Sequence, residues 1–270
     1  IFRKVMLTPK GKSHGLVLLL DCSGSMSENM SGSIEQILVL TMFCRKVNIP
    51  FRVFGFTDCT DTFKIDHNIK NYNEYDNSNR SFSNKVGELG FSNVQLREYL
   101  NSKMSNVEFT KSLRNMILLK QSYHIGRGYT YNRVGRPLSE NLSNTPLIQA
   151  VFAVGSIMEN FRQTNNLDLT SLVIVHDGDA DSSAYYNIEN EYKNTDDEVV
   201  KHIHSYGFDV RAYNVIVRDR KNKFEYAMKM DNKKNYSYHT NEELLKSALE
   251  WIRVVGKSKV FGFFILATRN

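Results

Sequence analysis

The sequence has few cysteines, which argues against a disulfide-stabilised or zinc-binding protein. Three cysteines, Cys22, Cys44 and Cys59, are too few and too odd in number for a disulfide framework, and no CxxC pair suggests zinc. We interpret Cys44 as a small core residue on a helix and Cys22 and Cys59 as loop thiols. Unpaired thiols favour a reducing compartment, so the predicted location is the cytoplasm.

Long apolar runs are also absent. The longest run, residues 260–267, contains Gly262 and has the length of a strand, whereas a membrane span needs about 18 apolar residues. No secretory signal opens the sequence. Because the first residue is Ile1 rather than Met, we expect the chain to be a piece of a longer polypeptide. We find no internal repeat, and we expect no membrane span.

Acidic residues are missing from one stretch and scarce in another. Residues 111–136 contain six Lys or Arg and no acid, and residues 218–234 contain seven bases and three acids. These stretches account for the net charge of +6 and the pI near 9.1. The excess indicates either a polyanionic partner or a solvated surface.

Apolar strand-like runs alternate with helical patterns along the chain. Alternating elements favour an α/β fold with a doubly wound, mostly parallel central sheet flanked by helices. We predict a first part of the domain at 1–66, a large insertion of loop and helices at 67–140, and a second part with a C-terminal extension at 141–270. The expected strands lie near 15–20, 51–56, 62–65, 172–175, 209–217 and 259–267. The expected helices lie near 34–47 with Ser33 as N-cap, 93–104, 110–123, 146–161 with Thr145 as N-cap, 196–205 and 241–252.

The first predicted strand ends on oxygen-bearing side chains at alternate positions. Asp21, Ser23 and Ser25 follow the apolar run 17–20, and Gly24 allows the loop to turn sharply. A Val/Leu run bounded by a turn is typical of a strand covered on both faces. Ligands of open α/β sheets bind at the carboxyl ends of the strands, so we expect a site here.

Two further segments offer oxygen ligands at the same predicted edge. Thr145 precedes Pro146 at a helix start, where proline suits the first turn. Asp177 directly follows the apolar strand near 172–175 and precedes Gly178. Hydroxyl and carboxylate oxygens suit a small divalent cation, so we expect Mg²⁺, with Mn²⁺ or Ca²⁺ as the alternatives.

This arrangement resembles the metal-ion-dependent adhesion site (MIDAS) of von Willebrand factor A (vWA) domains. Their pattern is D-x-S-x-S followed by a separate Thr and a separate Asp, and the matching residues are Asp21, Ser23, Ser25, Thr145 and Asp177. The resemblance covers about 15–57 and 144–253 and leaves the segment between them unmatched. It implies the strand order 3-2-1-4-5-6, which would place the two aspartates on neighbouring strands.

The resemblance also implies roles for these residues. Ser23, Ser25 and Thr145 would ligate the ion directly or nearly so, and the two aspartates would act mostly through water. One coordination position would remain for an Asp or Glu of a partner protein. The side chains that we expect to contact this partner beside the metal are Met26, Asp179 and Asp181.

Other site classes fit the sequence less well. The loop 177–181 resembles a calcium loop, but Ser182 and Ile188 occupy positions where an EF-hand needs Gly and Glu. A P-loop at Lys12 would need an upstream glycine where Met6 stands. Neither loop serine lies in a G-x-S-x-G elbow, so we expect no enzyme activity.

The basic stretch near 123–136 suggests a second kind of partner. Three tyrosines interleave with three arginines, which is compatible with stacking and phosphate contacts on single-stranded nucleic acid. The residues are Tyr123, Tyr129 and Tyr131 with Arg127, Arg133 and Arg136. No known nucleic-acid motif accompanies them, so we do not favour this partner.

Our leading hypothesis is a non-enzymatic, Mg²⁺-dependent protein-interaction domain. The D-x-S-G-S-M form of the loop resembles intracellular vWA proteins of the cobalt-chelatase-subunit type, which work beside MoxR-like AAA+ ATPases. A second hypothesis is a structural or assembly protein, such as a phage virion component, that uses the fold as a scaffold. A third is RNA binding in the manner of Ro-type proteins, which also carry this domain.

Overall fold

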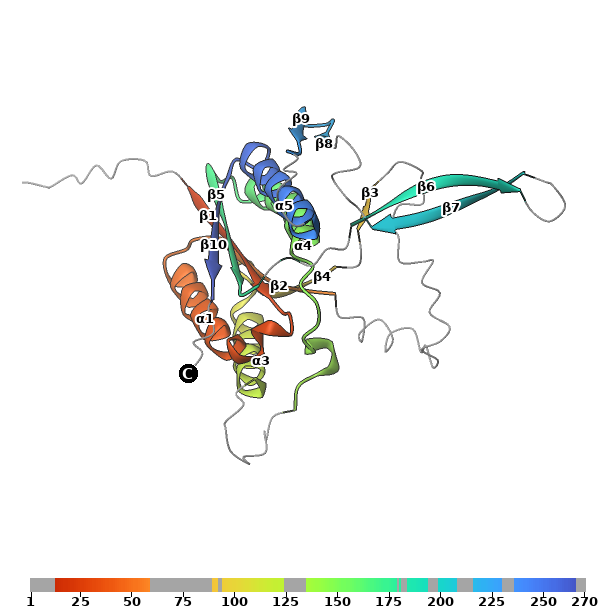
Figure 1. The fold of residues 1–270 in the computed structure, drawn as a ribbon. Helices are drawn as coiled ribbons and strands as arrows, with labels where there is room; N and C mark the ends of the chain where they lie inside the picture. Colours follow the sequence, from red (N-terminus) through yellow and green to blue (C-terminus); the bar gives the residue numbers. More distant parts are fainter. Residues whose placement is uncertain are drawn as a thin grey trace, which may run out of the picture.

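The central feature of the structure is a five-stranded sheet with helices on both faces (Figure 1). The structure is a computed structural model. The residues that it describes are 13–58, 89–91, 94–123, 135–178, 180, 184–193, 199–207, 216–229 and 236–265. The five-stranded sheet with helices on both faces confirms the α/β class predicted from the sequence.

The sheet is mostly parallel. β1 (His14–Asp21) pairs in parallel with β2 (Phe51–Thr57) on one side and with β5 (Leu169–His176) on the other. β10 (Ser258–Phe264) extends the sheet in parallel beside β5, and β4 (Gln95–Asn101) closes the opposite edge antiparallel to β2. The order is β10-β5-β1-β2-β4.

This order differs from the predicted six-stranded one. The described sheet has five strands, and of the strand expected at 209–217 only β8 (Ile216–Asp219) includes described residues. β8 pairs with β9 (Phe224–Ala227) in a separate two-stranded sheet. The strand expected near 62–65 lies outside the described residues. β1 and β5 are nevertheless neighbours in the sheet. Leu20 of β1 lies opposite Val175 of β5.

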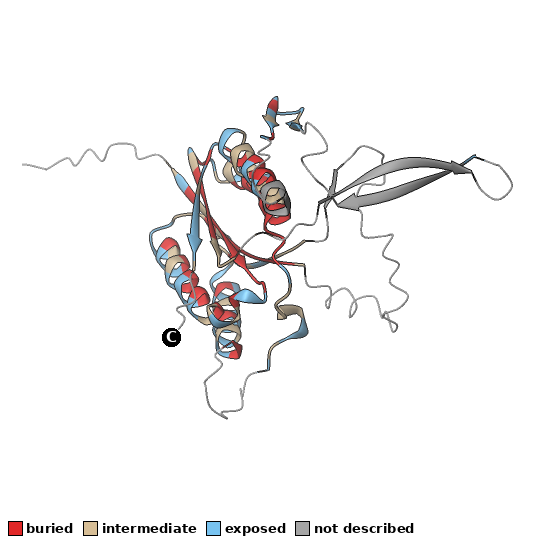
Figure 2. Ribbon diagram, viewed as in Figure 1, coloured by how far each residue is buried: buried red, intermediate tan, exposed pale blue. Residues whose placement is uncertain are grey.

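Helices cover each face of the sheet in pairs. α1 (Met30–Lys46) and α3 (Asn106–Ser122) pack on one face, and α4 (Leu147–Thr164) and α5 (Tyr236–Val254) pack on the other. Figure 2 shows buried residues concentrated where these helices meet the strands. No described helix is both long enough and apolar enough to cross a membrane.

The alternation of side chains along β1 divides the core in two. Leu18 and Leu20 join the cluster on the α1 side, whereas Val17 and Leu19 join the cluster on the α4 side. All four side chains are at most 1% exposed. Successive residues of a strand point to opposite faces, so an unbroken apolar run is what a strand covered on both faces requires.

The helix predicted at 93–104 is wrong, because this segment forms strand β4. Leu96 packs in the core cluster on the α4 side, while Tyr99 and Leu100 both pack in the cluster on the α1 side. The pairing of β4 with β2 is irregular between Val53 and Phe54, where the register skips Tyr99. An extra residue of this kind shifts the side-chain alternation. The apolar residues therefore fall at a spacing that imitates a helix.

The helix predicted at 196–205 is also wrong. β7 (Val199–Gly207) pairs antiparallel with β6 (Ala184–Lys193), and β6 pairs with the short strand β3 (Leu89–Phe91). β7 contains Val, Ile and Tyr, which favour strands, and pairing with β6 decides the outcome. In Figure 1 this hairpin extends away from the central sheet.

Two predicted helix caps are wrong as well. α1 begins at Met30, so Ser33 lies inside the helix and its hydroxyl donates to the Asn29 carbonyl at 2.9 Å. α4 has Pro146 at its N-cap position rather than Thr145. Thr145 therefore lies just outside the helix, in the loop that approaches the end of β1.

Candidate metal centre

The candidate site begins where β1 ends. The Asp21 side chain is completely buried, and its Oδ1 accepts a hydrogen bond from the Ser23 backbone N–H at 2.9 Å. This contact closes a local turn of the kind that Asp residues form with the backbone two positions on. The turn directs the Ser23 and Ser25 hydroxyls toward each other.

Hydroxyl and carboxylate oxygens form a chain across two neighbouring strands. The Oγ atoms of Ser23 and Ser25 are 2.9 Å apart, and Ser25 Oγ donates to Asp177 Oδ1 at 2.7 Å. Asp177 directly follows β5, the parallel neighbour of β1. The predicted convergence of these loops at one sheet edge is therefore present in the structure.

The Thr145 segment lies against the same loop. The Gly24 N–H donates to the Ser143 carbonyl at 2.7 Å, and the Ser143 N–H donates to the Cys22 carbonyl at 3.4 Å. Thr145 follows two residues later and is 7% exposed. The pairing of backbone groups thus brings the third predicted segment beside the two serines.

A residue that we did not predict holds this segment from the other side. Asp58 directly follows β2, and its two carboxylate oxygens accept hydrogen bonds from the Asn144 backbone at 2.9 Å and the Asn144 amide at 2.7 Å. The rule that carboxyl ends of parallel strands share one edge applies to β2 as well, so it could have identified Asp58. Asp58 supports the site by fixing the residue next to Thr145.

The donor set fits Mg²⁺ by its chemistry. Three hydroxyls and two carboxylates supply hard oxygens, which this ion prefers over imidazole or thiolate. Among the described residues, no three His, Cys, Asp or Glu side chains gather into a group that could hold a metal ion. The candidate site therefore depends on its hydroxyls and differs from carboxylate-rich or imidazole-rich metal centres.

Burial varies across the site. Asp21 and Ser23 are at most 1% exposed, whereas Ser25 is exposed and Asp177 is intermediate. An ion held among these oxygens would therefore lie with Asp21 on its protein side and Ser25 toward solvent. The Ser25 side is therefore the side of the described site that is open to a partner.

The side chains expected to contact a partner need correction. Met26 is 0% exposed and packs in the core cluster with α1, because the short helix η1 (Ser25–Glu28) turns it inward. It therefore cannot contact a partner. Asp179 and Asp181 lie outside the described residues.

The candidate polyanion site is only partly described. Four of its residues lie outside the described part of the chain: Arg127, Arg133, Tyr129 and Tyr131. Tyr123 is 4% exposed, and its hydroxyl donates to the Glu140 carbonyl at 2.6 Å. The Arg136 guanidinium stacks 4.3 Å from the centre of its ring. Tyr123 is therefore a packed residue whose ring is not free to stack on a base.

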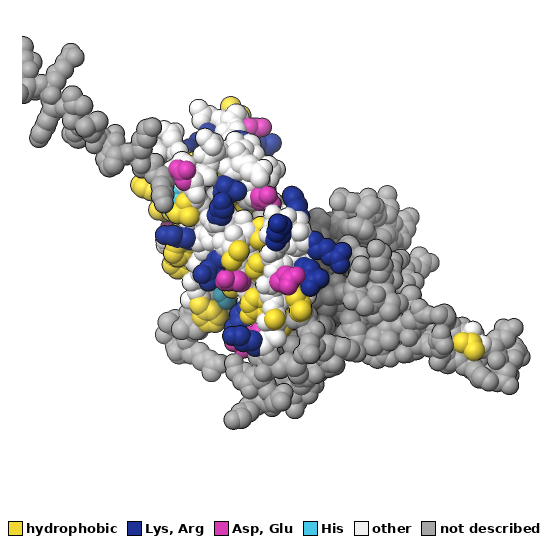
Figure 3. Space-filling model, turned by 90° about the horizontal axis from the view of Figure 1, so that it is seen from above, with side chains coloured by type: hydrophobic (Ala, Val, Ile, Leu, Met, Phe, Trp, Pro, Cys, Tyr) yellow, Lys and Arg dark blue, Asp and Glu magenta, His cyan; other side chains and the backbone are white. Residues whose placement is uncertain are grey.

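In the described part of the second charged stretch, an arginine is paired with an acid. Arg218 pairs with Glu225 at 2.7 Å on the β8–β9 hairpin, and Arg253, beyond that stretch on α5, likewise pairs with Glu250 at 2.9 Å. Figure 3 shows Lys and Arg side chains scattered among acidic and hydrophobic ones on the face seen from above. Such paired charges are typical of a solvated surface.

Cys22 lies in the loop after β1, as predicted, but its thiol is buried. Its side chain is 3% exposed, with Sγ 3.8 Å from the Tyr99 hydroxyl. Burial raises the pKa of the Cys22 thiol to about 12, so it is neutral at physiological pH. Cys44 is buried on α1, as predicted.

Comparison with known proteins does not place the chain in a family. No protein-family model matches it, and no curated protein sequence matches it. What the protein does must therefore be argued from the site itself.

Proposed function

We propose that the chain is a non-enzymatic, Mg²⁺-dependent protein-interaction domain of the vWA type, in which a partner's Asp or Glu completes the metal shell. The observation that carries this proposal is the oxygen chain from Ser23 through Ser25 to Asp177. It joins loops from two neighbouring parallel strands at the edge where α/β sheets bind ligands.

The hydroxyl and carboxylate residues would contribute to ion binding in different ways. Ser23, Ser25 and Thr145 would supply neutral hydroxyl oxygens, while Asp21 and Asp177 would supply negative charge close by. When bound, the ion would act as a Lewis acid that accepts an incoming carboxylate. Neutral ligands leave more of the ion's charge available to that carboxylate than direct carboxylate ligands would.

The exposure of the site supports capture of a protein group from outside. Ser25 and Gly24 are exposed, and Asp177 is partly exposed, so a partner side chain can reach the oxygen cluster. The D-x-S-G-S-M form of the loop leads us to propose an AAA+ ATPase of the MoxR-like class as the partner. The chain would then serve as its adaptor.

A calorimetric titration tests the metal site. We expect Mg²⁺ to bind the wild-type chain with one site, and Ser25→Ala to abolish or strongly weaken this binding. Ser27→Ala is the matched control, because Ser27 lies in the same turn but outside the D-x-S-x-S pattern. Equal Mg²⁺ affinity in all three proteins would refute the metal site.

A second titration tests the capture of a carboxylate. With acetate as the probe, we expect amide NMR shifts near Ser25 and Gly178 when Mg²⁺ is present and none when EDTA is present. Shifts of the same size in EDTA would show that acetate binds without the ion. That result, or no shift in either condition, would contradict the proposed function.

A further inference from the structure

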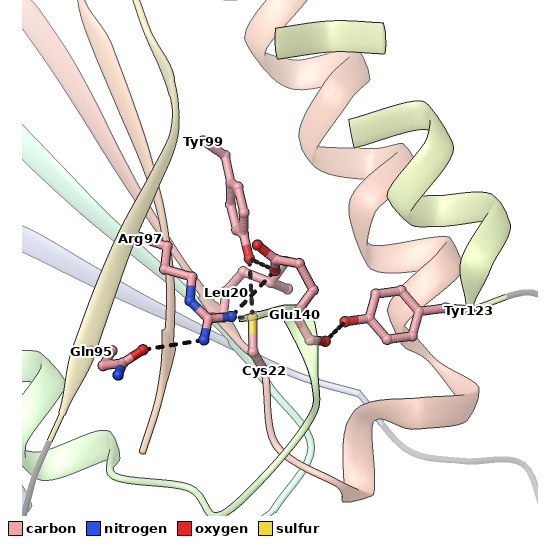
Figure 4. A network of polar contacts seen from close by, with 7 residues as sticks. All are labelled: Leu20, Cys22, Gln95, Arg97, Tyr99, Tyr123 and Glu140. Carbon is pink, nitrogen blue, oxygen red and sulfur yellow. Dashed lines mark hydrogen bonds and ion pairs between the residues drawn. The ribbon is translucent and has the colours of Figure 1, made fainter. Parts of the chain in front are cut away.

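A polar cluster lies beside the metal loop and joins it to a part of the chain that the metal motif does not include (Figure 4). Cys22 of the loop faces Tyr99 of β4, and Tyr99 donates a hydrogen bond to Glu140 Oε2 at 2.7 Å. Arg97, also on β4, donates to the same oxygen at 3.3 Å. The side chains of Arg97 and Glu140 are 15% and 16% exposed, so this charge pair is largely buried.

Glu140 is held at both its side chain and its backbone. Its carboxylate accepts the hydrogen bonds of Tyr99 and Arg97, and its carbonyl accepts the hydroxyl of Tyr123 at the end of α3. Bonds to a charged, buried acceptor are stronger than those between neutral groups. Glu140 ends the short helix η4 (Leu138–Glu140), so the cluster fixes the point from which the next segment starts.

That next segment is the one that carries Thr145. Ser143, three residues after Glu140, exchanges backbone hydrogen bonds with Gly24 and Cys22 of the metal loop. The cluster therefore touches both segments that supply the hydroxyls. It contacts the loop through Cys22, and it anchors the Thr145 segment through Glu140.

We propose that Glu140 and Tyr99 are positioning residues for the metal centre, which set the Thr145 segment at the correct place relative to Ser23 and Ser25. This inference rests on the proposed function. All members of the cluster come from the segment 67–140 except Cys22 and Leu20, whose carbonyl oxygen lies 3.7 Å from Cys22 Sγ. That segment therefore supports the metal centre as well as separating the two halves of the motif.

Two conservative substitutions test the contacts of Glu140 and Tyr99. Glu140→Gln preserves shape and keeps one acceptor oxygen but removes the negative charge, so the bonds that this oxygen accepts from Tyr99 and Arg97 lose their charge assistance. Tyr99→Phe removes a single hydroxyl and leaves the ring in place. Loss of a residue that hydrogen-bonds a metal ligand typically lowers metal affinity by about 10- to 100-fold, and Glu140 and Tyr99 act one contact further away, through the Thr145 segment and Cys22.

The experiment measures the Mg²⁺ dissociation constant by calorimetry, at a temperature where far-UV circular dichroism shows each variant folded. We expect Glu140→Gln and Tyr99→Phe to bind Mg²⁺ about 10-fold more weakly than the wild type, the low end of that range. The matched control is Glu98→Gln, because Glu98 lies on the same strand but pairs with Arg52 at 2.6 Å. We expect it to bind within twofold of the wild type.

Two comparisons separate positioning from general loss of stability. Gly155→Ala should disturb the packing of α4 on α5, away from the cluster, and should leave Mg²⁺ affinity unchanged. If Tyr99→Phe and any folded Glu140→Gln bind like the wild type while Asp177→Asn does not, the positioning role is refuted and the metal site stands. If Asp177→Asn also binds like the wild type, the proposed function itself fails.

Discussion

Gly55 of β2 determines how closely Tyr99 can approach the metal loop. A Cβ atom at this position would lie 2.6 Å from a ring carbon of Tyr99 and 2.9 Å from Cys22 Sγ. Both distances are shorter than real Cβ contacts allow, so any side chain at Gly55 must displace the ring, the thiol or both. The absence of a side chain here is what lets Tyr99 cross over β2.

Gly55→Ala should therefore lower the free energy of unfolding by about 1–3 kcal/mol, the usual effect of overpacking a core. Urea denaturation followed by circular dichroism measures this. Gly262→Ala is the control, since Gly262 lies in β10 of the same sheet and its added Cβ would meet nothing within 4 Å. Equal stability of both variants would contradict the close packing of Tyr99 and Cys22 against Gly55.

The buried Cys22 thiol should make the free energy of unfolding depend on pH. Burial raises the pKa of this thiol from 9.0 to about 12, so the folded protein keeps it neutral at a pH where the unfolded chain ionises it. Its contribution to stability is complete below pH 9 and is lost as the pH rises from about 9 to 12. In that range we expect the free energy of unfolding to fall by up to about 1.4 kcal/mol per pH unit.

Cys22→Ala isolates this effect from other groups that titrate at high pH. Denaturation curves between pH 8 and 11 should show a shallower loss of stability for the variant than for the wild type. The same burial should protect Cys22 of the native protein from iodoacetamide at pH 8, because the thiolate is the reactive form. Parallel pH slopes, together with rapid alkylation, would contradict the burial of this thiol.

Residues of the site differ in how readily the sequence discloses them. Asp21, Ser23 and Ser25 lie within five positions at a strand end, so their pattern is visible in the chain itself. Glu140 and Asp58 act through partners that the fold brings to them from distant positions. No local spacing encodes such contacts, and only the tertiary structure reveals them.

Helices α4 and α5 pack closely because α4 carries a glycine at their contact. A Cβ atom at Gly155 would collide with the Trp251 ring of α5. Trp251 in turn donates a hydrogen bond to Asp219 of β8 at 2.9 Å, which ties the β8–β9 hairpin to the same helix. The contact of the two helices thus depends on a residue without a side chain.

We expect Gly155→Ala to destabilise the protein by about 1–3 kcal/mol through overpacking. Gly32→Ala makes the same change inside α1, where the added Cβ would meet nothing within 4 Å. This control should gain about 0.5–1 kcal/mol, because alanine loses less entropy than glycine in a helix. Thermal melts of the pair measure both effects, and a stabilised Gly155→Ala protein would disprove the close contact.

Elements with strong local patterns were predicted well, whereas those decided by pairing were not. The apolar runs of β1, β2 and β5 and the amphipathic pattern of α5 all gave strands or helices of the right kind. β4 was predicted as a helix because a register irregularity puts Tyr99 and Leu100 in the same core cluster. Its antiparallel pairing with β2 is a property of the fold, which the spacing of its apolar residues conceals.

At the scale of the whole molecule, the candidate site exists only when distant segments meet. The loop after β1 lies more than a hundred residues before the segment preceding α4 and before the loop after β5, and all three join at one edge of the sheet. An ion that binds these segments together should bind the folded state and not the unfolded chain. Metal binding and folding are therefore expected to be linked.

Mg²⁺ should raise the stability of the folded protein. At a free concentration 100 times its dissociation constant, the linkage predicts about 2.7 kcal/mol of stabilisation. Urea denaturation with and without Mg²⁺ measures this gain, and EDTA should reverse it. Asp177→Asn should show little or no gain, and the idea fails if Mg²⁺ stabilises this variant as much as the wild type.

The most direct measurement of the central claim is anomalous X-ray diffraction from crystals of the protein grown with Mn²⁺, which replaces Mg²⁺ at oxygen sites. We predict one anomalous peak within direct coordination distance of Ser23 Oγ and Ser25 Oγ, with Thr145 and Asp177 beside it. A map without a peak at these hydroxyls, at a Mn²⁺ concentration that saturates binding in solution, would contradict the account.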